Sequence, residues 1–462
     1  MIKQSFYLLV GYLSLIHTTS YAQAPTTLPL AKAWELAFEN YPGLKEKKAQ
    51  ISLSEYQQRL VKHQALPQAQ LQLQNTYGTY AGSSGAFFPL PGIFNVNSGN
   101  TLPGEPEATT NAYGSLVLDW KLFEFGKQRK SVAAAAQLTA TAQSNFTAYQ
   151  LAVQSKVTRQ YFDILFYQSL LSLTGDNLAR IKDILELSKS LGEAGLKPMA
   201  DTLLAAASYK QVQGEQSLQT GQLQAGKIQL MEMLTVPTAH FNIPAAAYLN
   251  IPAAITGNDT SIQPHHPYLD VIDQQLQYEL LQQEIVSRKI FPSLSLLGGV
   301  ASRGSGIHTN GKVNNSWQAG FDNRANNYLA GLGLTWNMTN AYNSLTEKKK
   351  AAQQVQATRF HQQTQALQLH TNLLAVYSRI REQWQQVQFT TAAVQQAQQG
   401  YELYLARYES GLISLTELLQ IQALLQQAEK NHIDASRQWW EQQIIKAELT
   451  TDFTYLLQQF EN

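Results

Sequence analysis

The stretch YESGLISLTELLQ, residues 408–420, has a counterpart earlier in the chain, GEAGLKPMADTLL at residues 192–204. Four pairs of similar residues keep one offset of 216 between the two stretches: Gly195 and Gly411, Leu196 and Leu412, Asp201 and Glu417, and Leu203 and Leu419. A pattern that returns at a constant offset indicates an internal repeat. The sequence therefore predicts two copies of one structural unit, with this turn at the same place in each.

Each stretch is predicted to be a tight turn between two helices. Gly411 follows apolar residues at helical spacing, and it fits the position after a helix where the backbone turns left-handed. Ser414 and Glu417 then have the spacing of a capping box, which starts a new helix. Pro198 stands in the place of Ser414 in the first stretch and is favoured as a first helical residue. Asp201 follows in the first turn, where a negative charge suits the helix dipole.

These hairpin tips could be helix caps and nothing more. Capping explains the glycines and Ser414, but it does not explain why Leu196, Leu412 and Ile413 should stand on an exposed tip. Apolar groups gathered on a surface mark sites of interaction with a partner. The alternative to a purely structural turn is therefore a docking site.

The repeat extends through most of the chain. Further pairs lie 225 or 216 residues apart: Tyr41-Pro42 with His266-Pro267, Leu66-Pro67 with Phe291-Pro292, Trp120 with Trp336, and Tyr161 with Tyr377. The predicted organisation is a signal peptide at residues 1–22, a first copy at 23–235, a linker at 236–262 and a second copy at 263–462. Each copy is predicted to run helix, strand, long loop, strand, long helix, turn and helix.

The first residues of the chain resemble an export signal. Lys3 supplies a positive charge, residues 6–16 are apolar but too few to span a bilayer, and Ser20-Tyr21-Ala22 fits a cleavage site. A membrane anchor is the alternative. No other stretch holds 18 consecutive apolar residues, so a mature chain that crosses a membrane must do so as β-strands.

Alternation with a period of two predicts a strand pair in each copy. In the first copy glutamines alternate with Ala69, Leu71 and Leu73 after Pro67, which ends a helical pattern over residues 28–66. The returning strands place these residues on one face: Leu116, Leu118, Trp120 and Leu122, and in the second copy Leu332, Leu334, Trp336 and Met338. The connections at 81–111 and 301–327 are rich in Gly, Asn and Ser, and are predicted to be exposed, mobile loops.

Aromatic residues at the ends of these strands fit the belts that flank the apolar band of a membrane barrel. Trp120 and Trp336 are predicted to form one belt. Tyr113 and Tyr328, with Tyr77 and Tyr80, are predicted to form the opposite one. Four strands cannot close a barrel, because about eight are needed, so the chain must associate with copies of itself. Two copies would give eight strands and three would give twelve, and the strands alone leave this open.

Helical stretches of roughly 65 residues follow Trp120 and Trp336, which corresponds to about 100 Å each. Such lengths require packing of the coiled-coil kind. The doubled order of helix, strand pair and long hairpin, together with the two G-L-x-x-x-x-[DE] tips, resembles the TolC-like outer-membrane efflux family over about residues 28–457. The resemblance implies an α+β membrane protein. Four strands per chain would contribute to a trimeric, twelve-stranded transmembrane β-barrel, and the long antiparallel hairpins would form a periplasmic α-barrel.

The resemblance also implies a function and partners. The chain would be the passive exit duct of a tripartite efflux or secretion system in the outer membrane of a Gram-negative bacterium. Its partners would be a periplasmic adaptor, which docks at the tips, and an inner-membrane pump. The adaptor contacts of the family fall on these four residues: Gly195, Leu196, Gly411 and Leu412.

The resemblance places the closed entrance of the duct at the same tips. The family's locking acid falls on Asp201, its locking tyrosine on Tyr408, and its inner acidic ring on Glu417. Two positions depart from the family pattern, because Ile413 stands in place of a locking arginine and Gln420 in place of a second acid. These departures concern the locking mechanism and not the fold.

The remaining composition excludes several other functions. The net charge of +1 gives no field that would recruit nucleic acid, and the absence of cysteine excludes disulfides and thiolate zinc sites. His265 and His266 lie between two prolines, which favours a helix start over a metal site. No arrangement of catalytic residues indicates an enzyme, and no cofactor or metal is predicted. The alternatives are a structural coiled-coil protein of the cell envelope and a periplasmic hairpin adaptor, neither of which requires doubled strand pairs.

Overall fold

The structure is a computed structural model that describes residues 26–79, 108–236, 241–244, 248–249, 251, 265–308 and 312–460. The predicted export signal lies outside these residues. The chain divides into two compact units. The first contains Met1–Lys48, Asn145–Asp270 and Thr364–Asn462, and the second contains Ala49–Ser144 and Val271–Gln363.

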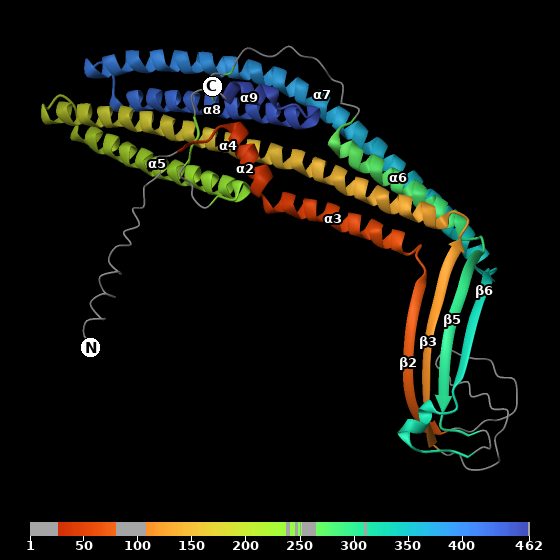
Figure 1. Cartoon of the computed structure of the whole chain (residues 1–462). Coiled ribbons are helices and arrows are strands. Elements are labelled where there is room, and N and C mark those ends of the chain that lie inside the picture. The colour runs from red at the N-terminus through yellow and green to blue at the C-terminus, as the bar shows by residue number, and fades with distance from the viewer. Residues whose placement is uncertain are drawn as a thin grey trace, which may run out of the picture. The chain divides into compact units, whose positions relative to one another are not determined.

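The elements follow the doubled order that the sequence predicts (Figure 1). The first copy consists of α2 (Leu30–Asn40), α3 (Pro42–His63), β2 (Gln68–Thr79), β3 (Ala108–Phe123), α4 (Lys127–Glu193) and α5 (Met199–Leu234). The second consists of α6 (Pro267–Arg288), β5 (Ser293–Ser305), η1 (Trp317–Phe321), β6 (Ala325–Thr335), α7 (Asn340–Glu409) and α8 (Leu415–Thr450). The helix α9 (Thr454–Phe460) follows. The long helices α4 and α7 have 67 and 70 residues, which confirms the predicted lengths.

The helical pattern predicted over residues 28–66 is interrupted in the structure. Helix α2 ends at Asn40, Tyr41 is extended with φ −60° and ψ 121°, and α3 begins at Pro42. A proline clashes with a helical conformation in the residue before it, so Tyr41 leaves the helix. In the second copy α6 likewise begins at a proline, Pro267, directly after His266.

The first unit has an aromatic core. Trp439, Trp440 and Tyr161 are fully buried there, and the Tyr161 hydroxyl donates to the carbonyl of Leu28 at 3.0 Å. Part of the predicted linker joins this core, since the Trp440 indole donates to the carbonyl of Tyr248 at 2.9 Å. Within the same linker, β4 (Phe241–Asn242) pairs in parallel with β1 (Thr26–Thr27). The described residues of the linker therefore contact both copies within this unit.

The second unit contains an antiparallel sheet in the order β2-β3-β5-β6 (Figure 1). One row of its register joins Leu71, Leu116, Val300 and Tyr328. All four side chains are exposed. Successive residues alternate between faces, so this row shares its face with the row of Ala69, Leu118, Gly298 and Ala330 and with the row of Trp120, Leu296 and Leu332. Over these rows the face is apolar, as the sequence predicts. Among the described residues, no helix is both long enough and apolar enough to cross a membrane.

The register corrects one of the predicted aromatic belts. Tyr113 pairs with Gln74 and Arg303, so it lies on the polar face of the sheet, opposite the face of Trp120 and Tyr328. It therefore does not belong with the exposed apolar face. The prediction overlooked that residues 113 and 120 are separated by an odd number of positions. Tyr80 lies outside the described residues.

The predicted mobile loops are also partly wrong. Residues 108–111 belong to β3, and 301–305 belong to β5. The short helix η1 packs against the end of the sheet, where the Thr110 hydroxyl donates to the carbonyl of Ser316 at 3.0 Å and Ala319 is buried. Gly304 makes this contact possible, because an added Cβ would lie 2.4 Å from the carbonyl oxygen of Gly320. Residues 80–107 lie outside the described residues.

Candidate functional site: the hairpin tips

Both long helices end in the same left-handed turn. The Gly195 N–H donates to the carbonyl of Gly192 at 3.0 Å and the Leu196 N–H donates to that of Leu191 at 2.9 Å. In the second copy Gly411 and Leu412 repeat these bonds to Tyr408 and Arg407. With φ of +70° and +77° at the two glycines, both turns are Schellman motifs, as predicted.

The second helix of each hairpin starts differently. Ser414 forms the predicted capping box, since the Glu417 carboxylate accepts from its N–H at 2.7 Å and from its hydroxyl at 2.8 Å. These bonds favour the charged carboxylate and lower the pKa of Glu417. In the first copy α5 begins at Met199, so Pro198 is the cap residue rather than the first helical residue.

The two leucines that follow the glycines are largely exposed to solvent. Leu196 and Leu412 are each 70% exposed. Ile413 was predicted to be exposed as well, and this is wrong: it is 8% exposed and packs in a cluster with Tyr408 and Leu415. The β-branched residue after the turn points back into the bundle, whereas the leucine before it points outward.

Lys197 joins the two tips, and the sequence interpretation missed it. Its ammonium donates to the carbonyl of Ile413 at 2.9 Å and to that of Gly411 at 3.5 Å, and it lies 5.3 Å from the centre of the Tyr408 ring. Lys197 and Ile413 are repeat equivalents. The sequence did contain a signal for this contact, because one copy has a lysine at the position where the other copy has an apolar residue.

The predicted entrance residues occupy distinct environments. Tyr408 is fully buried, and this burial raises the pKa of its hydroxyl, with the negative charge of Asp201 acting in the same direction. Glu417 is exposed and its carboxylate is engaged with Ser414.

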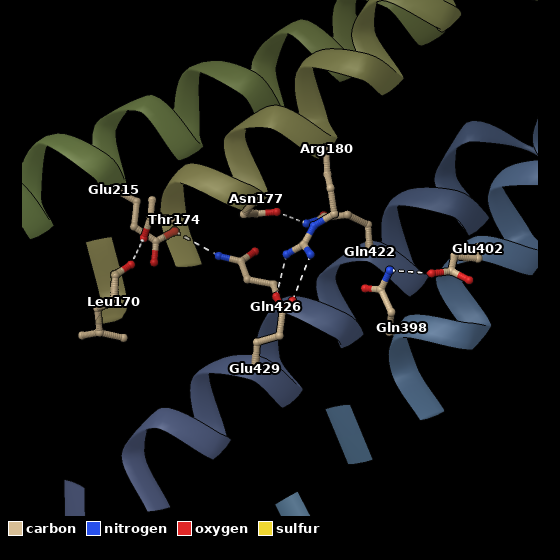
Figure 2. Close-up of polar contacts among 10 residues, drawn as sticks. All are labelled: Leu170, Thr174, Asn177, Arg180, Glu215, Gln398, Glu402, Gln422, Gln426 and Glu429. Atoms are coloured by element: carbon tan, nitrogen blue, oxygen red, sulfur yellow. Dashed lines mark hydrogen bonds and ion pairs between the residues drawn. The ribbon is translucent and has the colours of Figure 1, made fainter. Parts of the chain in front are cut away.

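A polar layer lies deeper between the hairpins, where α4, α5 and α8 meet (Figure 2). Arg180 and Glu429 point toward one another and form two parallel hydrogen bonds of 2.9 and 2.5 Å. The Asn177 carbonyl accepts from the amide of Gln422. The amide of Gln426 donates to Glu215 on α5 at 3.1 Å. The sequence interpretation assigned none of these contacts.

His266 starts helix α6 and is fully buried. Its carbonyl accepts from the N–H groups of Leu269 and Asp270, and its Nδ1 accepts from the N–H of Tyr268 at 3.2 Å. Its Nε2 then donates to the carbonyl of Glu448 at 3.3 Å. Burial lowers the pKa of this imidazole. These bonds are those of a helix start, the interpretation that the flanking prolines favoured.

Long helical hairpins joined to strand pairs, repeated twice in one chain, define a channel protein of the efflux type. The family model described as outer membrane efflux protein matches residues 34–236 and 263–445. The chain belongs to this family, and it is an outer-membrane exit duct. Its family and fold are those of channel proteins and not of enzymes.

Similar proteins share this architecture. Nodulation protein T of Rhizobium leguminosarum bv. trifolii is 23% identical over 331 residues, which cover 71% of this chain and 68% of that protein. The CmeC outer membrane channel of Campylobacter jejuni has a TM-score of 0.72 at 15% identity, over 91% of this chain and 85% of that one. VceC of Vibrio cholerae also has a TM-score of 0.72 at 15% identity, over 92% and 96%. The two solved structures confirm the fold.

Proposed function

We propose that three copies of the chain form the duct, that the hairpin tips form its periplasmic entrance, and that the tips dock an adaptor linked to an inner-membrane pump. The observation that supports this most is the packing of α4 on α8 within one chain, through the layer that contains Arg180 and Glu429. These two helices come from different copies of the repeat. The repeat-equivalent pair is α7 with α5, and it would form between neighbouring chains.

The surfaces of α5 and α7 support such a contact. Apolar side chains are exposed on both helices: Leu203, Leu218 and Ile228 on α5, and Leu367, Phe389 and Leu403 on α7. A contact between two different surfaces of identical subunits builds a closed ring when the repeated rotation from one subunit to the next adds up to a full turn. In the same way, β2 and β6 at the two edges of the sheet would pair with strands of neighbouring chains.

The need for a lumen in a duct favours three copies over two. Eight strands from two chains would leave an interior filled by side chains, whereas twelve from three chains leave a lumen. The apolar face of the sheet would then contact lipid, with Trp120, Trp336 and Tyr328 near the membrane surfaces. The polar face, lined by glutamines of β2, would contact water in the duct.

At the periplasmic end, Leu196 and Leu412 are the proposed adaptor contacts, because they are exposed beside rigid, glycine-capped turns. Asp201, Tyr408 and Glu417 are the proposed entrance residues. In a trimer three Glu417 carboxylates would face a common axis and would bind cations. The division into copies at residues 23–235 and 263–462 stays a prediction.

The purified protein tests this proposal. We expect oligomers that persist in detergent on a gel until heated, and stepwise channel conductance when the protein is added to a planar lipid bilayer. A monomer that is soluble without detergent and forms no channel would contradict the proposal. That result would instead favour a structural coiled-coil protein of the envelope.

A further inference from the structure

The apolar face of the sheet has a hollow near the end where β5 connects to β6 through η1. Small residues of two neighbouring strands form its floor: Ala112, Gly114, Ser302 and Gly304. They lie on the face of Leu116 and Val300, because an even number of positions separates them from these residues. Leu73 and Phe321 also line the hollow, which has a volume of about 510 Å³. Such a volume is within the range of ligand sites.

A second hollow, also of about 510 Å³, continues the first along the same face. The two share Leu73, Gly114 and Ser302. Exposed apolar side chains line the second hollow: Leu71, Leu116, Val300 and Tyr328. The two hollows therefore form one groove, here called the face groove, which is apolar along most of its length and could hold a hydrocarbon chain.

Arg324 places a positive charge at the end of the face groove near η1. The residue before it, Asn323, is left-handed with φ +45°, and its side-chain amide donates to the carbonyls of Ser305 at 3.1 Å and Ile307 at 2.7 Å. The Nε of Arg324 donates to the carbonyl of Phe321 at 2.8 Å. These bonds tie the guanidinium to a segment that is packed against the sheet.

The charge of Arg324 is not neutralised by the part of the chain that the structure describes. No described carboxylate forms an ion pair with it, and its remaining N–H groups make no hydrogen bond to a described residue. A guanidinium binds phosphate through parallel hydrogen bonds. An apolar groove that ends at such a cation is complementary to a molecule with a hydrocarbon chain and an anionic phosphate, which is the chemistry of a membrane lipid.

The position of Arg324 fits the headgroup of such a lipid. Helices precede β2 and β5 and follow β3 and β6, so η1 lies at the opposite end of the sheet, which is the outer end in the proposed duct. Trp317 on η1 is 66% exposed, and its ring centre lies 6.4 Å from that of Phe321. Aromatic rings of this kind are enriched where lipid headgroups meet the hydrocarbon core.

We propose that the face groove binds a membrane lipid with an anionic phosphate headgroup. Its acyl chain lies over Leu116 and Val300, and its phosphate binds Arg324. The site is built within one chain, and the inference rests on the proposed contact of the apolar face with the membrane.

Native mass spectrometry of the detergent-purified protein tests the charged end of the site. The probes are phosphatidylglycerol and phosphatidylcholine with the same acyl chains, because only the first has a net negative charge. We expect phosphatidylglycerol to bind about fivefold more tightly, as a partly exposed ion pair would allow. Arg324→Gln should abolish this preference. Arg303→Gln is the matched control and should keep it, because Arg303 lies on the opposite, polar face of the sheet.

Ser302→Phe tests the apolar part, because Ser302 lies where the two hollows join. It should weaken the binding of both lipids, whereas Ser295→Phe on the polar face should not. Three results would overturn the inference: equal binding of the two lipids by the natural protein, the same loss in Arg324→Gln and Arg303→Gln, or unchanged binding in Ser302→Phe. Displacement of the lipid by millimolar inorganic phosphate would also overturn it, since the site would then be one for free anions.

Failure of the proposed duct is distinguishable from failure of the lipid site. In the first case the natural protein would form no oligomers and no channels in planar bilayers. In the second, oligomers and channels would form while lipid binding followed none of these expectations. Arg324→Gln and Ser302→Phe should both retain the conductance of the natural protein, which shows that the variants are folded.

Discussion

The indole Nε1 of Trp120 donates a hydrogen bond to the carbonyl oxygen of Ala65 at 2.9 Å. Trp336 makes the same bond to Ile290 at 3.0 Å. The two donors are repeat equivalents, and so are the two acceptors. Each bond links the end of the second strand of a copy to the segment before its first strand. The accepting residue lies two positions before the proline that precedes that first strand. The repeat therefore preserves tertiary contacts as well as sequence.

Replacing Trp336 with Phe should weaken the junction between strand and helix in the second copy. The ring is kept but the donor is lost, so we expect a loss of about 1 kcal/mol in the free energy of unfolding. Urea titration of the purified protein in detergent measures this. Tyr328→Phe is the control, because the tyrosine lies on the same face and is 87% exposed. Equal stability of the two variants would mean that the Trp336 bond contributes nothing.

Replacing Gly411 with Trp should abolish export while oligomers still reach the outer membrane. The φ of +77° opposes any side chain, but nothing lies within 4 Å of an added Cβ, so the expected strain is only about 1–2 kcal/mol. The bulky ring would then project into the adaptor surface. Gly411→Ala adds the same strain without the bulk, and it should retain export. Loss of oligomers in both variants would instead indicate a folding role.

Removing the charge of Glu417 should raise single-channel conductance in planar bilayers, because three carboxylates that bind cations would slow their passage. Glu417→Ala also removes the capping bonds to Ser414. Glu417→Gln keeps a side chain that can complete the capping box, so it isolates the charge. Unchanged conductance in both variants would exclude the acidic ring, and a change in the alanine variant alone would point to capping.

The stability of the protein should fall as the pH drops below about 6.5, the ordinary pKa of histidine. Burial lowers the pKa of His266 in the folded state, although the carboxylates of Glu448 and Asp270 oppose this shift. As the pH falls, the imidazole therefore takes up a proton in the unfolded chain before it does so in the folded chain. The stability that is present above the pKa of the unfolded chain is lost as the pH falls through the lower pKa of the folded chain.

His266→Asn tests this pH dependence, because asparagine is also a favoured helix cap. Its unfolding free energy should fall less between about pH 7 and about pH 5 than that of the natural protein. Burial also lowers the pKa of His432, so part of the dependence should remain. A variant with the full pH dependence would show that His266 does not contribute.

Arg180→Leu should destabilise the helical hairpins by about 3–5 kcal/mol, because it leaves Glu429 with an unpaired charge in a largely buried position. Arg180→Leu combined with Glu429→Leu should be less destabilised than the single variant, since no charge is then stranded. Thermal unfolding followed by circular dichroism measures both. If the losses in unfolding free energy from the two separate substitutions added up to the loss of the double variant, the two residues would not be coupled.

Much of the fold could be predicted from the sequence, because its determinants are local. Alternation after Pro67 gave the strand pairs and their apolar face, and the spacing from Gly411 to Glu417 gave the turn and the next helix. The constant offset of the repeat gave the order of elements. Local patterns fail where a single residue overrides them, as Pro42 does by dividing the predicted first helix.

The sequence by itself determined the two copies, the long hairpins and the glycine-capped tips, since periodicity and caps depend on neighbours along the chain. Only the tertiary structure decided that Arg180 pairs with Glu429, that Lys197 binds the carbonyl of Ile413, and that Tyr113 lies apart from the apolar face. Periodicity shows which residues of a helix share a face, but not which other helix covers that face. That choice is made by packing between segments far apart in the chain.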